Sequence, residues 1–401
     1  MRVRRYALVA GGGTGGHLVP ALVVAEAIAA ERGPEAVELV GSRRGLDAEL
    51  LASHELPATL LPGRGIVRKA DPRALAANVV AVVGLAFAFA LAVSIVGRRR
   101  PAVVVAMGGY ASVPAALAAA LMRVPVVLVN VDAVPGAANR LVGRVARAAA
   151  VAFPGTALPR AVLTGAPVRP ELVAAAHAGP EARAEARHSL GLATDGLVVG
   201  VVGGSLGARR LNEAVLGLVE LWAARPGVAV YHVVGRRDEE LVAGAAAARE
   251  RAADPEPADP ERAADPEQAT SRERRVLQYV WVPYEHDMAR FYQAADVVVC
   301  RSGANTVAEL TVVGVPAVLV PLPGAPGDHQ NANAEVLEHA GAAVVVPDPQ
   351  CTAARLAEVL DALGADGGRL DAMRKAAAAL GRPDAVAAVM ALLHEHARVG
   401  R

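Results

Sequence analysis

Four glycine-rich segments occur at corresponding places in the two halves of this sequence, and each directly follows a short apolar run. Glycine lets backbone N–H groups approach a phosphate closely, and the N-terminus of a following helix favours negative charge. One such segment is often an ordinary tight turn. Four of them predict two sheets whose carboxyl edges face a cleft suited to two phosphate-bearing ligands. The segments are residues 11–17 (GGGTGGH), 107–112 (MGGYAS), 203–208 (GGSLGA) and 300–304 (CRSGA).

The rest of the chain alternates β-rich runs with Ala/Leu-rich stretches. Continuous apolar strands separated by helices predict a parallel sheet covered on both faces. The pattern restarts at residue 196, after a Gly/Pro-rich join at 165–170, so we expect an α/β chain of two Rossmann-like, doubly wound units facing a cleft. The expected strands are 3–10, 36–40, 102–107, 125–130, 149–153, 196–202, 228–234, 276–282, 296–299 and 317–321, and the expected helices include 20–32, 45–53, 114–122, 210–223 and 383–399.

Composition and charge exclude several classes of protein. Lys+Arg 41 against Asp+Glu 40, with 3% aromatic residues, argue against a nucleic-acid partner. Two cysteines, Cys300 and Cys351, indicate a reducing compartment, and no Cys/His cluster has the spacing of a metal site. The N-terminal apolar run meets glycines at once, which predicts a strand and not a signal peptide. Residues 236–275 are charged and of low complexity, which predicts a flexible surface insertion.

Residues 79–96 form an uncharged run that is followed by Arg98, Arg99 and Arg100. Its length is marginal for a membrane span, and seven of its 18 residues are Ala, Gly or Ser. Three interpretations stay open at this point: a buried helix of the α/β unit, a helix lying on a membrane surface with the arginines near anionic headgroups, and a membrane-spanning helix.

Three polar positions near the glycine-rich segments are candidates for chemistry. His17 can be a helix cap or a general base, because its ordinary pKa lies near neutral pH. Glu309 lies on a helix that we expect Ser302 to cap, where it can be a solvated residue or accept two hydrogen bonds from a ribose diol. Residues 328–333 (DHQNAN) form a polar cluster after an expected strand, a position suited to reading a sugar. An NADP-dependent dehydrogenase is a weaker alternative, because the glycine-rich segments recur in both halves.

In its motifs the sequence closely resembles the bacterial MurG family of N-acetylglucosaminyltransferases, over nearly the whole chain. The resemblance implies a GT-B fold, conversion of lipid I to lipid II by inversion, and no metal or other cofactor. It also implies a peripheral location at the cytoplasmic face of the inner membrane through the helix at 79–96, and a cell-wall synthesis complex as a further partner. The motifs are 11–22 (GGGTGGHLVPAL), 107–119 (MGGYASVPAALAA), 153–157 (FPGTA), 165–172 (GAPVRPEL), 203–213 (GGSLGARRLNE), 300–323 (CRSGANTVAELTVVGVPAVLVPLP) and 328–334 (DHQNANA).

The resemblance assigns one substrate to each unit. Residues 169–382 would bind UDP-N-acetylglucosamine, with Glu309 on the ribose, Gln330 on the sugar and residues 284–288 along the uracil. The donor contacts that the resemblance implies are Arg169, Ser205, Tyr284, Met288, Ser302, Ala304, Asn305, Thr306, Glu309 and Gln330. Residues 1–168, joined by the C-terminal helix at 383–399, would take lipid I. The implied acceptor contacts are Thr14, Gly15, Gly16, Gly108, Gly109, Tyr110 and Asn139.

Two departures from the family pattern concern catalysis. The family has His-Glu-x-Asn where this chain has residues 129–132 (VNVD), so Asn130 replaces a glutamate and cannot accept a proton. We therefore assign the general base to His17, with Asp132 as the alternative. Leu206 replaces a glutamine near the nucleotide. These departures leave room for a related GT-B transferase with another lipid or natural-product acceptor, or for a lipid-pyrophosphate binder without activity.

Overall fold

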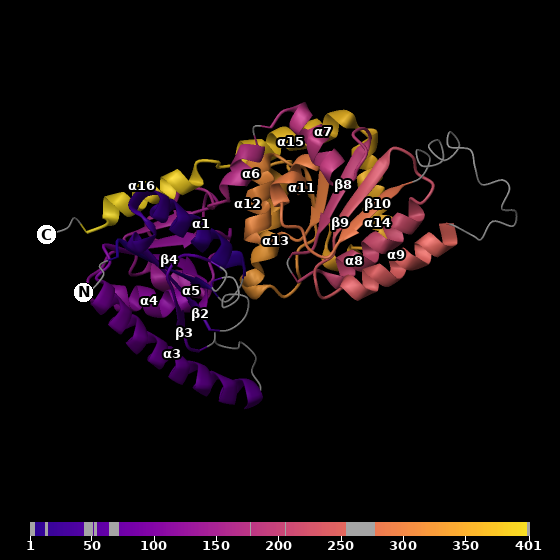
Figure 1. Cartoon of the computed structure of the whole chain (residues 1–401). Coiled ribbons are helices and arrows are strands. Elements are labelled where there is room, and N and C mark those ends of the chain that lie inside the picture. Colours follow the sequence, from indigo (N-terminus) through magenta and orange to yellow (C-terminus); the bar gives the residue numbers. More distant parts are fainter. Residues whose placement is uncertain are drawn as a thin grey trace, which may run out of the picture.

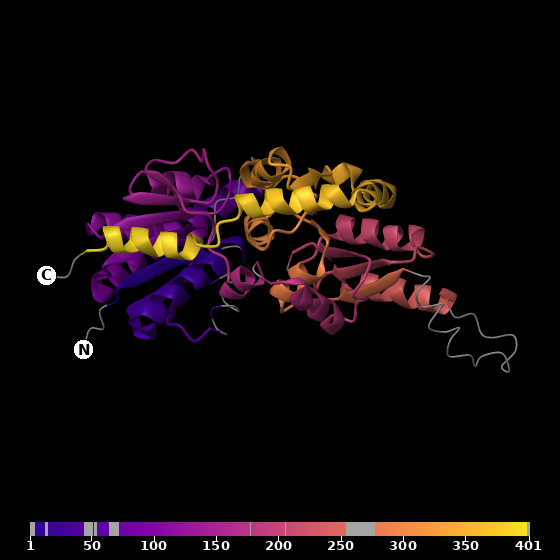
Figure 2. The ribbon, with the colours of Figure 1, turned by 90° about the horizontal axis from the view of Figure 1, so that it is seen from above.

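The computed structural model describes residues 5–12, 15–43, 51, 54–63, 72–176, 178–204, 206–253 and 277–398. Within these residues the chain forms two parallel β-sheets, one from each half of the sequence, with helices on both faces of each sheet (Figure 1). The two units lie side by side, and the last helix of the chain returns to the first unit (Figure 2).

The first unit is a seven-stranded sheet of order β3-β2-β1-β4-β5-β6-β7. Its elements are β1 (Ala7–Gly12), α1 (Gly15–Arg32), β2 (Val37–Ser42), β3 (Ala58–Leu61), α3 (Pro72–Arg99), β4 (Val103–Gly108), α4 (Gly109–Leu121), β5 (Val126–Asn130), α5 (Ala137–Gly143), β6 (Ala148–Val151), β7 (Ala161–Leu163) and α16 (Ala385–His396). Ala7 and Val9 pack towards α1 and α16, whereas Leu8 and Ala10 pack towards α3 and α4. Because both faces of β1 are covered, its sequence is continuously apolar.

The second unit repeats this plan with a six-stranded sheet of order β10-β9-β8-β11-β12-β13. Its elements are α6 (Pro170–Ala175), α7 (Pro180–Ser189), β8 (Leu197–Val202), α8 (Arg209–Leu221), β9 (Val228–Val233), α9 (Glu239–Ala253), β10 (Gln278–Val282), α11 (Met288–Ala294), β11 (Val297–Cys300), α12 (Ala304–Val313), β12 (Ala317–Leu319), α13 (His329–His339), β13 (Ala343–Val345), α14 (Ala353–Ala365) and α15 (Gly367–Leu380). Val199 and Val201 pack towards α8 and α14, and Val198 packs towards α11 and α12.

Two chain segments connect the units, residues 164–169 and residues 381–384. They touch at Gly165, whose φ is +84° and whose missing Cβ would lie only 2.3 Å from the Cβ of Arg382. Beyond this contact, α16 crosses β4, β5 and β6 of the first unit (Figure 2). At its end the backbone N–H of Arg398 donates to the carbonyl of Ala102 at 3.0 Å.

The expected α/β fold class is confirmed, and each of the ten expected strands overlaps an observed strand. The sequence did not reveal β3, β7 and β13, because these edge strands are only three or four residues long and such short runs give a weak signal. Helices α1 and α4 also begin earlier than expected. We expected Pro20 and Pro114 to start these helices, but the glycine-rich segments supply the preceding turn and both prolines lie inside.

The prediction that residues 236–275 form a flexible insertion is wrong for their first part. Residues Glu239–Ala253 form α9, whose Ala, Glu and Arg residues have high helix propensity. Val242 anchors this helix because its side chain is fully buried. The rest of the segment from residue 254, and the expected helix at 45–53 except Leu51, lie outside the described residues.

The uncharged run at 79–96 belongs to α3, which spans Pro72–Arg99 and lies along the outer edge of the first unit (Figure 1). The interpretation as a buried helix is wrong, because only 28% of the apolar window within Ala81–Arg99 is buried. Ala88, Ala92 and Val96 pack on the sheet, whereas Val82 and Phe87 are exposed. Among the described residues, two segments are long and apolar enough to cross a membrane. One lies in α3, and the other is Gly368–His396, which the Gly-Arg-Pro break divides between α15 and α16.

We predict that Gly165→Ala destabilises the chain by more than a glycine-to-alanine change at an equally strained position. Gly191 also has a positive φ of +71°, but a Cβ there meets nothing within 4 Å, so Gly191→Ala should cost only about 1–2 kcal/mol of conformational strain. At Gly165 the methyl group also collides with Arg382. Urea denaturation of the two variants measures the difference, and equal midpoints would contradict the close contact between the connecting segments.

Candidate active site

The glycine-rich ends of β1 and β4 touch each other at the carboxyl edge of the first sheet. Gly12 and Gly109 form an isolated bridge, and a Cβ on Gly109 would lie 1.8 Å from the carbonyl oxygen of Gly12. No side chain fits there, so glycine is required for this approach. The α1 and α4 helices begin directly after these strand ends, and their N-termini therefore share one edge of the sheet.

The His17 side chain lies against the second of these glycine-rich segments. A Cβ built on Gly108 would be 3.0 Å from the Nδ1 and Cε1 atoms of His17 and 3.0 Å from the Oδ1 atom of Asn139. His17 is half-buried in the first turn of α1. The structure thus brings together His17, Gly108, Gly109 and Asn139, which the sequence had assigned to the base and to the acceptor.

Asn130 is the last residue of β5, and it is only 1% exposed. Its Oδ1 atom accepts a hydrogen bond from the Asn139 side chain at 2.8 Å, and its Nδ2 atom donates to the backbone carbonyl of Asp132 at 2.6 Å. Both ends of the amide are therefore used to hold the chain after β5. In this structure Asn130 positions its neighbours, and its place among the predicted catalytic residues stays a prediction.

Asn333 on α13 joins the two units. It is fully buried and its Nδ2 atom donates to the Oδ1 atom of Asp132 at 3.1 Å and to the carbonyl of Ser302 at 3.1 Å. Its Oδ1 atom accepts from the backbone N–H of Ala133 at 2.8 Å. One amide thus connects the chain after β5 in the first unit with the chain after β11 in the second.

Glu309 lies at the centre of a second buried group. Its Oε2 atom accepts a hydrogen bond from the Tyr292 hydroxyl at 2.9 Å, and its Oε1 atom is 3.8 Å from Nη2 of Arg169. Burial raises the pKa of Glu309 above its ordinary value, while Arg169 and the Tyr292 hydrogen bond act to lower it. Arg169 is the last residue of the connecting segment 164–169 and directly precedes α6, so the ion pair lies where this segment enters the second unit.

The expectation that Ser302 caps α12 is wrong. The N-cap residue is Gly303, and the buried Ser302 hydroxyl donates to the backbone carbonyl of Gln330 at 2.8 Å. This bond ties the start of α12 to the start of α13. Gln330 in turn accepts through Oε1 from the backbone N–H of Leu322 at 2.9 Å. The two residues are thus close together, as a shared role at the donor would require.

The other predicted donor residues lie at the same edge of the second sheet. Tyr284 follows β10 and is 39% exposed, with the Arg236 guanidinium 5.4 Å from its ring. Met288 begins α11 and packs on the core below. Ala304, Asn305 and Thr306 form the first turn of α12.

Some predicted positions cannot be placed in the same way. Thr14 and Ser205 lie outside the described residues, and of Gly15 only the backbone is described, as the first residue of α1. Gly16 follows it in the first turn. In the first unit, Tyr110 turns its hydroxyl away from the glycines and donates to the Pro62 carbonyl at 2.8 Å. Leu206 is exposed beside the third glycine-rich segment.

The arrangement supplies hydrogen-bond donors, helix N-termini, one histidine and two carboxylates at the facing edges of two sheets. Such an edge can bind a diphosphate through helix dipoles and backbone N–H groups, and a sugar through amides and carboxylates. Within the part of the chain that the structure describes, no group of three or more His, Cys, Asp or Glu side chains could hold a metal ion.

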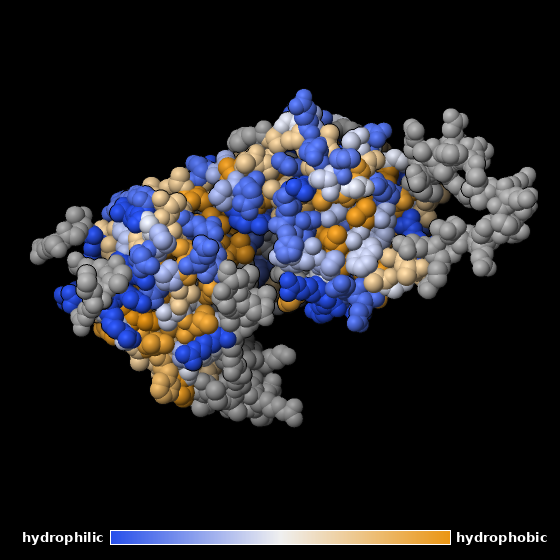
Figure 3. Space-filling view, viewed as in Figure 1, coloured by the Kyte–Doolittle hydropathy of each residue, from blue (hydrophilic) through white to orange (hydrophobic). Residues whose placement is uncertain are grey.

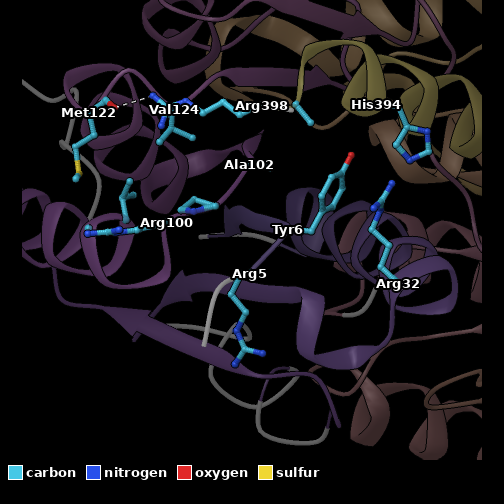
Figure 4. Close-up of a pocket in the computed structure, with 13 residues that line it drawn as sticks. Arg5, Tyr6, Arg32, Arg100, Ala102, Met122, Val124, His394 and Arg398 are labelled. Atoms are coloured by element: carbon cyan, nitrogen blue, oxygen red, sulfur yellow. Dashed lines mark hydrogen bonds between the residues drawn. The ribbon is translucent and has the colours of Figure 1, made fainter. Parts of the chain in front are cut away.

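A cavity of about 1080 Å³ lies at the opposite edge of the first sheet, where β1 and β4 begin (Figure 4). Tyr6 stands at its centre, with the Arg32 guanidinium 4.0 Å from its ring centroid. Arg100, Met122 and Arg398 line other parts of the wall. Because this cavity is at the amino ends of the strands, it does not belong to the candidate active site.

Comparison with known families covers both units. The model of the glycosyltransferase family 28 N-terminal domain matches residues 7–151, and the model of its C-terminal domain matches residues 198–389. A UDP-N-acetylglucosamine–N-acetylmuramyl-(pentapeptide) pyrophosphoryl-undecaprenol N-acetylglucosamine transferase from Desulforudis audaxviator is 38% identical, and the alignment covers 98% of this chain and 99% of the relative. A relative of the same name from Moorella thermoacetica is 36% identical, with 96% and 97% covered.

The chain belongs to the MurG family of glycosyltransferases. The crystal structure of MurG from Acinetobacter baumannii is 27% identical and superposes with a TM-score of 0.71, covering 98% of this chain and 99% of that chain. A UDP-GlcNAc 2-epimerase from Neisseria meningitidis bound to UDP-GlcNAc has a TM-score of 0.59 at 11% identity, with 97% and 99% covered, and shows the fold alone. The fold of this MurG family member is GT-B, as the sequence motifs implied.

Sequence reasoning missed two residues of this MurG-family site, Asn333 and Tyr292. Asn333 was part of a polar cluster that the sequence had marked, but nothing in one sequence shows that its amide crosses between the units. Tyr292 gave no signal, because an aromatic residue on the apolar face of a helix is typical of a core position.

We predict that Glu309→Gln stabilises the unliganded chain at pH 8. A carboxyl whose native pKa is raised loses stability as pH rises from its unfolded pKa through its native pKa, so ionised Glu309 costs stability at alkaline pH. The amide keeps an acceptor for Tyr292 and carries no charge, so the variant should have a higher free energy of unfolding than the parent at pH 8. Thermal unfolding at pH 8 and pH 4.5 measures this gain, which should shrink at the lower pH.

The matched control is Glu335→Gln on the exposed face of α13, which should show no such pH dependence. A Glu309→Gln variant that is less stable than the parent at pH 8 would show that the ion pair with Arg169 outweighs the cost of burial.

Proposed function

We propose that this chain transfers N-acetylglucosamine from UDP-N-acetylglucosamine to the muramyl 4-hydroxyl of lipid I, which gives lipid II for peptidoglycan synthesis. The observation that carries this proposal is the alignment of both units with relatives that bear the name of this transferase, at 36–38% identity over nearly the full length. The residues at the facing edges of the two sheets are of the types that this reaction needs.

The second unit supplies groups suited to the nucleotide sugar. The α12 N-terminus can stabilise the diphosphate through its dipole and its backbone N–H groups, and this stabilisation grows as UDP departs with its negative charge. Glu309 can accept from the ribose hydroxyls, and Gln330 carries a side-chain amide near the same helix start. Backbone N–H groups at a helix N-terminus can supply the charge stabilisation from the protein itself.

The first unit supplies the acceptor side and the base. The muramyl 4-hydroxyl attacks the anomeric carbon from the face opposite the diphosphate, the new glycosidic bond forms, and the bond to the phosphate oxygen breaks. A base must take the hydroxyl proton during attack. We assign this role to His17, because its ring lies beside the Gly108 segment and the side-chain amide of Asn130 is not basic enough to take a proton. Asp132 is the alternative, although one of its oxygens accepts from Asn333.

A second candidate function is transfer by the same mechanism to a different lipid acceptor. It is favoured by the buried Asn130, since the family has a glutamate at this position. An assay with purified lipid I and UDP-N-acetylglucosamine separates the two functions, because the first requires lipid II as the product. UDP-N-acetylglucosamine that binds without transfer to lipid I would favour the other acceptor.

In this assay we predict that His17→Ala lowers kcat by about 10²–10⁴-fold, the usual contribution of a general base, while donor affinity stays the same. The donor groups lie on the other unit, which explains the unchanged affinity. His339→Ala, an exposed histidine at the end of α13, is the matched control and should keep full turnover. If Asp132→Asn abolishes turnover and His17→Ala changes it only a few-fold, the base is Asp132.

We also propose that the chain is a peripheral protein of the cytoplasmic membrane face, held there by α3. Val82, Val83 and Phe87 are 56%, 51% and 68% exposed, and Figure 3 shows apolar side chains gathered at this corner of the first unit. Met122, directly after α4, is 37% exposed and lies beside Gly97 near the C-terminal end of α3. Arg100 follows α3 and is exposed, where it can meet acidic headgroups.

The other face of α3 argues that this helix lies on the membrane and does not cross it. Ala88, Ala92, Ile95 and Val96 are buried against the sheet and α4. A spanning helix would have to leave these contacts and expose the apolar face of its own sheet. A helix that lies on the membrane surface buries only its outer face in lipid and keeps its contacts with the sheet and α4.

We predict that Phe87→Ser weakens binding to anionic phospholipid vesicles by about 10-fold or more, because a fully buried Phe side chain contributes about 1.5–3 kcal/mol. Leu221→Ser, which removes a side chain of 61% exposure from α8 in the second unit, is the matched control and should bind as the parent does. Vesicle flotation measures both. Equal loss in the two variants would contradict a membrane-binding role for α3.

A further inference from the structure

Tyr292 is a buried residue of α11 for which the reaction described above has no direct use. It is 1% exposed, and its hydroxyl donates to the Oε2 atom of Glu309 at 2.9 Å. A buried phenol requires a hydrogen-bond partner, but a backbone carbonyl would satisfy it equally well. Here the partner is a carboxylate whose second oxygen is 3.8 Å from Arg169.

We propose that Tyr292 is the positioning residue of the donor site, which holds the Glu309 carboxylate so that Oε1 stays available to the ribose hydroxyls. The proposal rests on the proposed function, because it takes Glu309 as the group that binds the nucleotide. Tyr292 itself does not touch the substrate. Its hydroxyl holds Oε2 through a hydrogen bond, and this leaves the Glu309 carboxylate one orientation in place of several.

The geometry explains why the carboxylate needs this support. Glu309 is buried on α12, and burial in a poorly solvated site favours the neutral acid. A neutral acid accepts fewer hydrogen bonds and has one oxygen occupied by its own proton. The Tyr292 hydroxyl is a donor and therefore favours the ionised form. Because burial and the neighbouring carboxylate raise the pKa of Tyr292 well above its ordinary value, the phenol keeps its proton throughout the physiological range.

The charged and titratable groups around Glu309 come from several elements. Arg169, in the segment before α6, lowers the pKa of Glu309, and Glu171 on α6 raises it. Cys300 at the end of β11 is buried, and burial together with Glu309 raises its pKa, so it stays an uncharged thiol. The helices α1, α13 and α15 also pack on α12. Their titratable residues include His17, His329 and Arg374, of which Arg374 pairs with Asp296 and Asp371.

Tyr292→Phe isolates this role, because it removes one O–H group and keeps the ring in the core. Calorimetry with UDP-N-acetylglucosamine between pH 5 and pH 8 is the experiment, since this probe has no phosphate group that titrates in the range. We expect Kd at pH 7.5 to rise about 3- to 10-fold, the scale of one hydrogen bond. We also expect the loss of affinity at low pH to begin at a higher pH than in the parent. At saturating donor, kcat should stay within two-fold.

Two further variants make the result specific. In the Glu309→Gln variant, affinity for UDP-N-acetylglucosamine should no longer fall at low pH. The double variant Glu309→Gln/Tyr292→Phe should have the same pH profile as Glu309→Gln alone. Tyr279→Phe removes another hydroxyl from the same unit, that of a half-buried residue, which lies 3.0 Å from Nδ1 of His232. Nε2 of His232 faces the Oδ1 acceptor of Asn212, so Nδ1 accepts from Tyr279 and the bond is independent of Glu309. Tyr279→Phe should leave Kd and its pH profile unchanged.

The outcomes separate the two proposals. If the parent chain does not bind UDP-N-acetylglucosamine, the proposed function fails. If the parent binds and Tyr292→Phe has the same Kd and pH profile, the role of Tyr292 is overturned. A Tyr292→Phe variant with weaker binding but an unshifted pH profile also overturns it, because a purely structural role would produce that result.

Discussion

The relative placement of the two sheets is the constraint on which the site depends, and a buried amide, a glycine and an alanine help to maintain it. Asn333 uses three hydrogen bonds to tie the chain after β5 to the chain after β11. Gly165 and Arg382 bring the two connecting segments into contact with each other. Ala304 at the start of α12 packs into the core of the first unit. Each of these contacts lies within a few residues of a group assigned to a substrate, so the same short segments carry the contacts between the units and the predicted substrate groups.

Much of the fold could be predicted from the sequence, for a physical reason. A parallel sheet covered on both faces forces its strands to be apolar along their whole length, as Val103–Gly108 and Val297–Cys300 are, and such runs are visible in one sequence. The edge strands β3 and β13 are partly exposed and need no such run. The sequence also could not show that α3 is exposed, because an apolar helix has the same composition whether protein or lipid covers it.

The candidate site could be predicted only in part. Glycine-rich segments marked the strand ends, since backbone approach leaves a clear residue preference at Gly109. The hydrogen-bond partners of side chains leave no comparable residue preference in the sequence. Nothing in the order of residues shows that Ser302 bonds to Gln330 and not to its own helix, or that Tyr292 meets Glu309. These contacts depend on how one helix rotates against another, and many sequences with the same apolar pattern would rotate differently.

The return of α16 to the first sheet has a consequence for synthesis of the chain. Val389, Met390 and Leu393 complete the core that covers one face of β4, β5 and β6. A ribosome makes these residues only after it has made the whole second unit. During translation the first sheet therefore carries an open apolar face for most of the life of the nascent chain, and a message truncated near codon 380 leaves that face open permanently. Such a product exposes the kind of surface that chaperones and proteases recognise, so the first unit gains its complete core only once the second unit has been made.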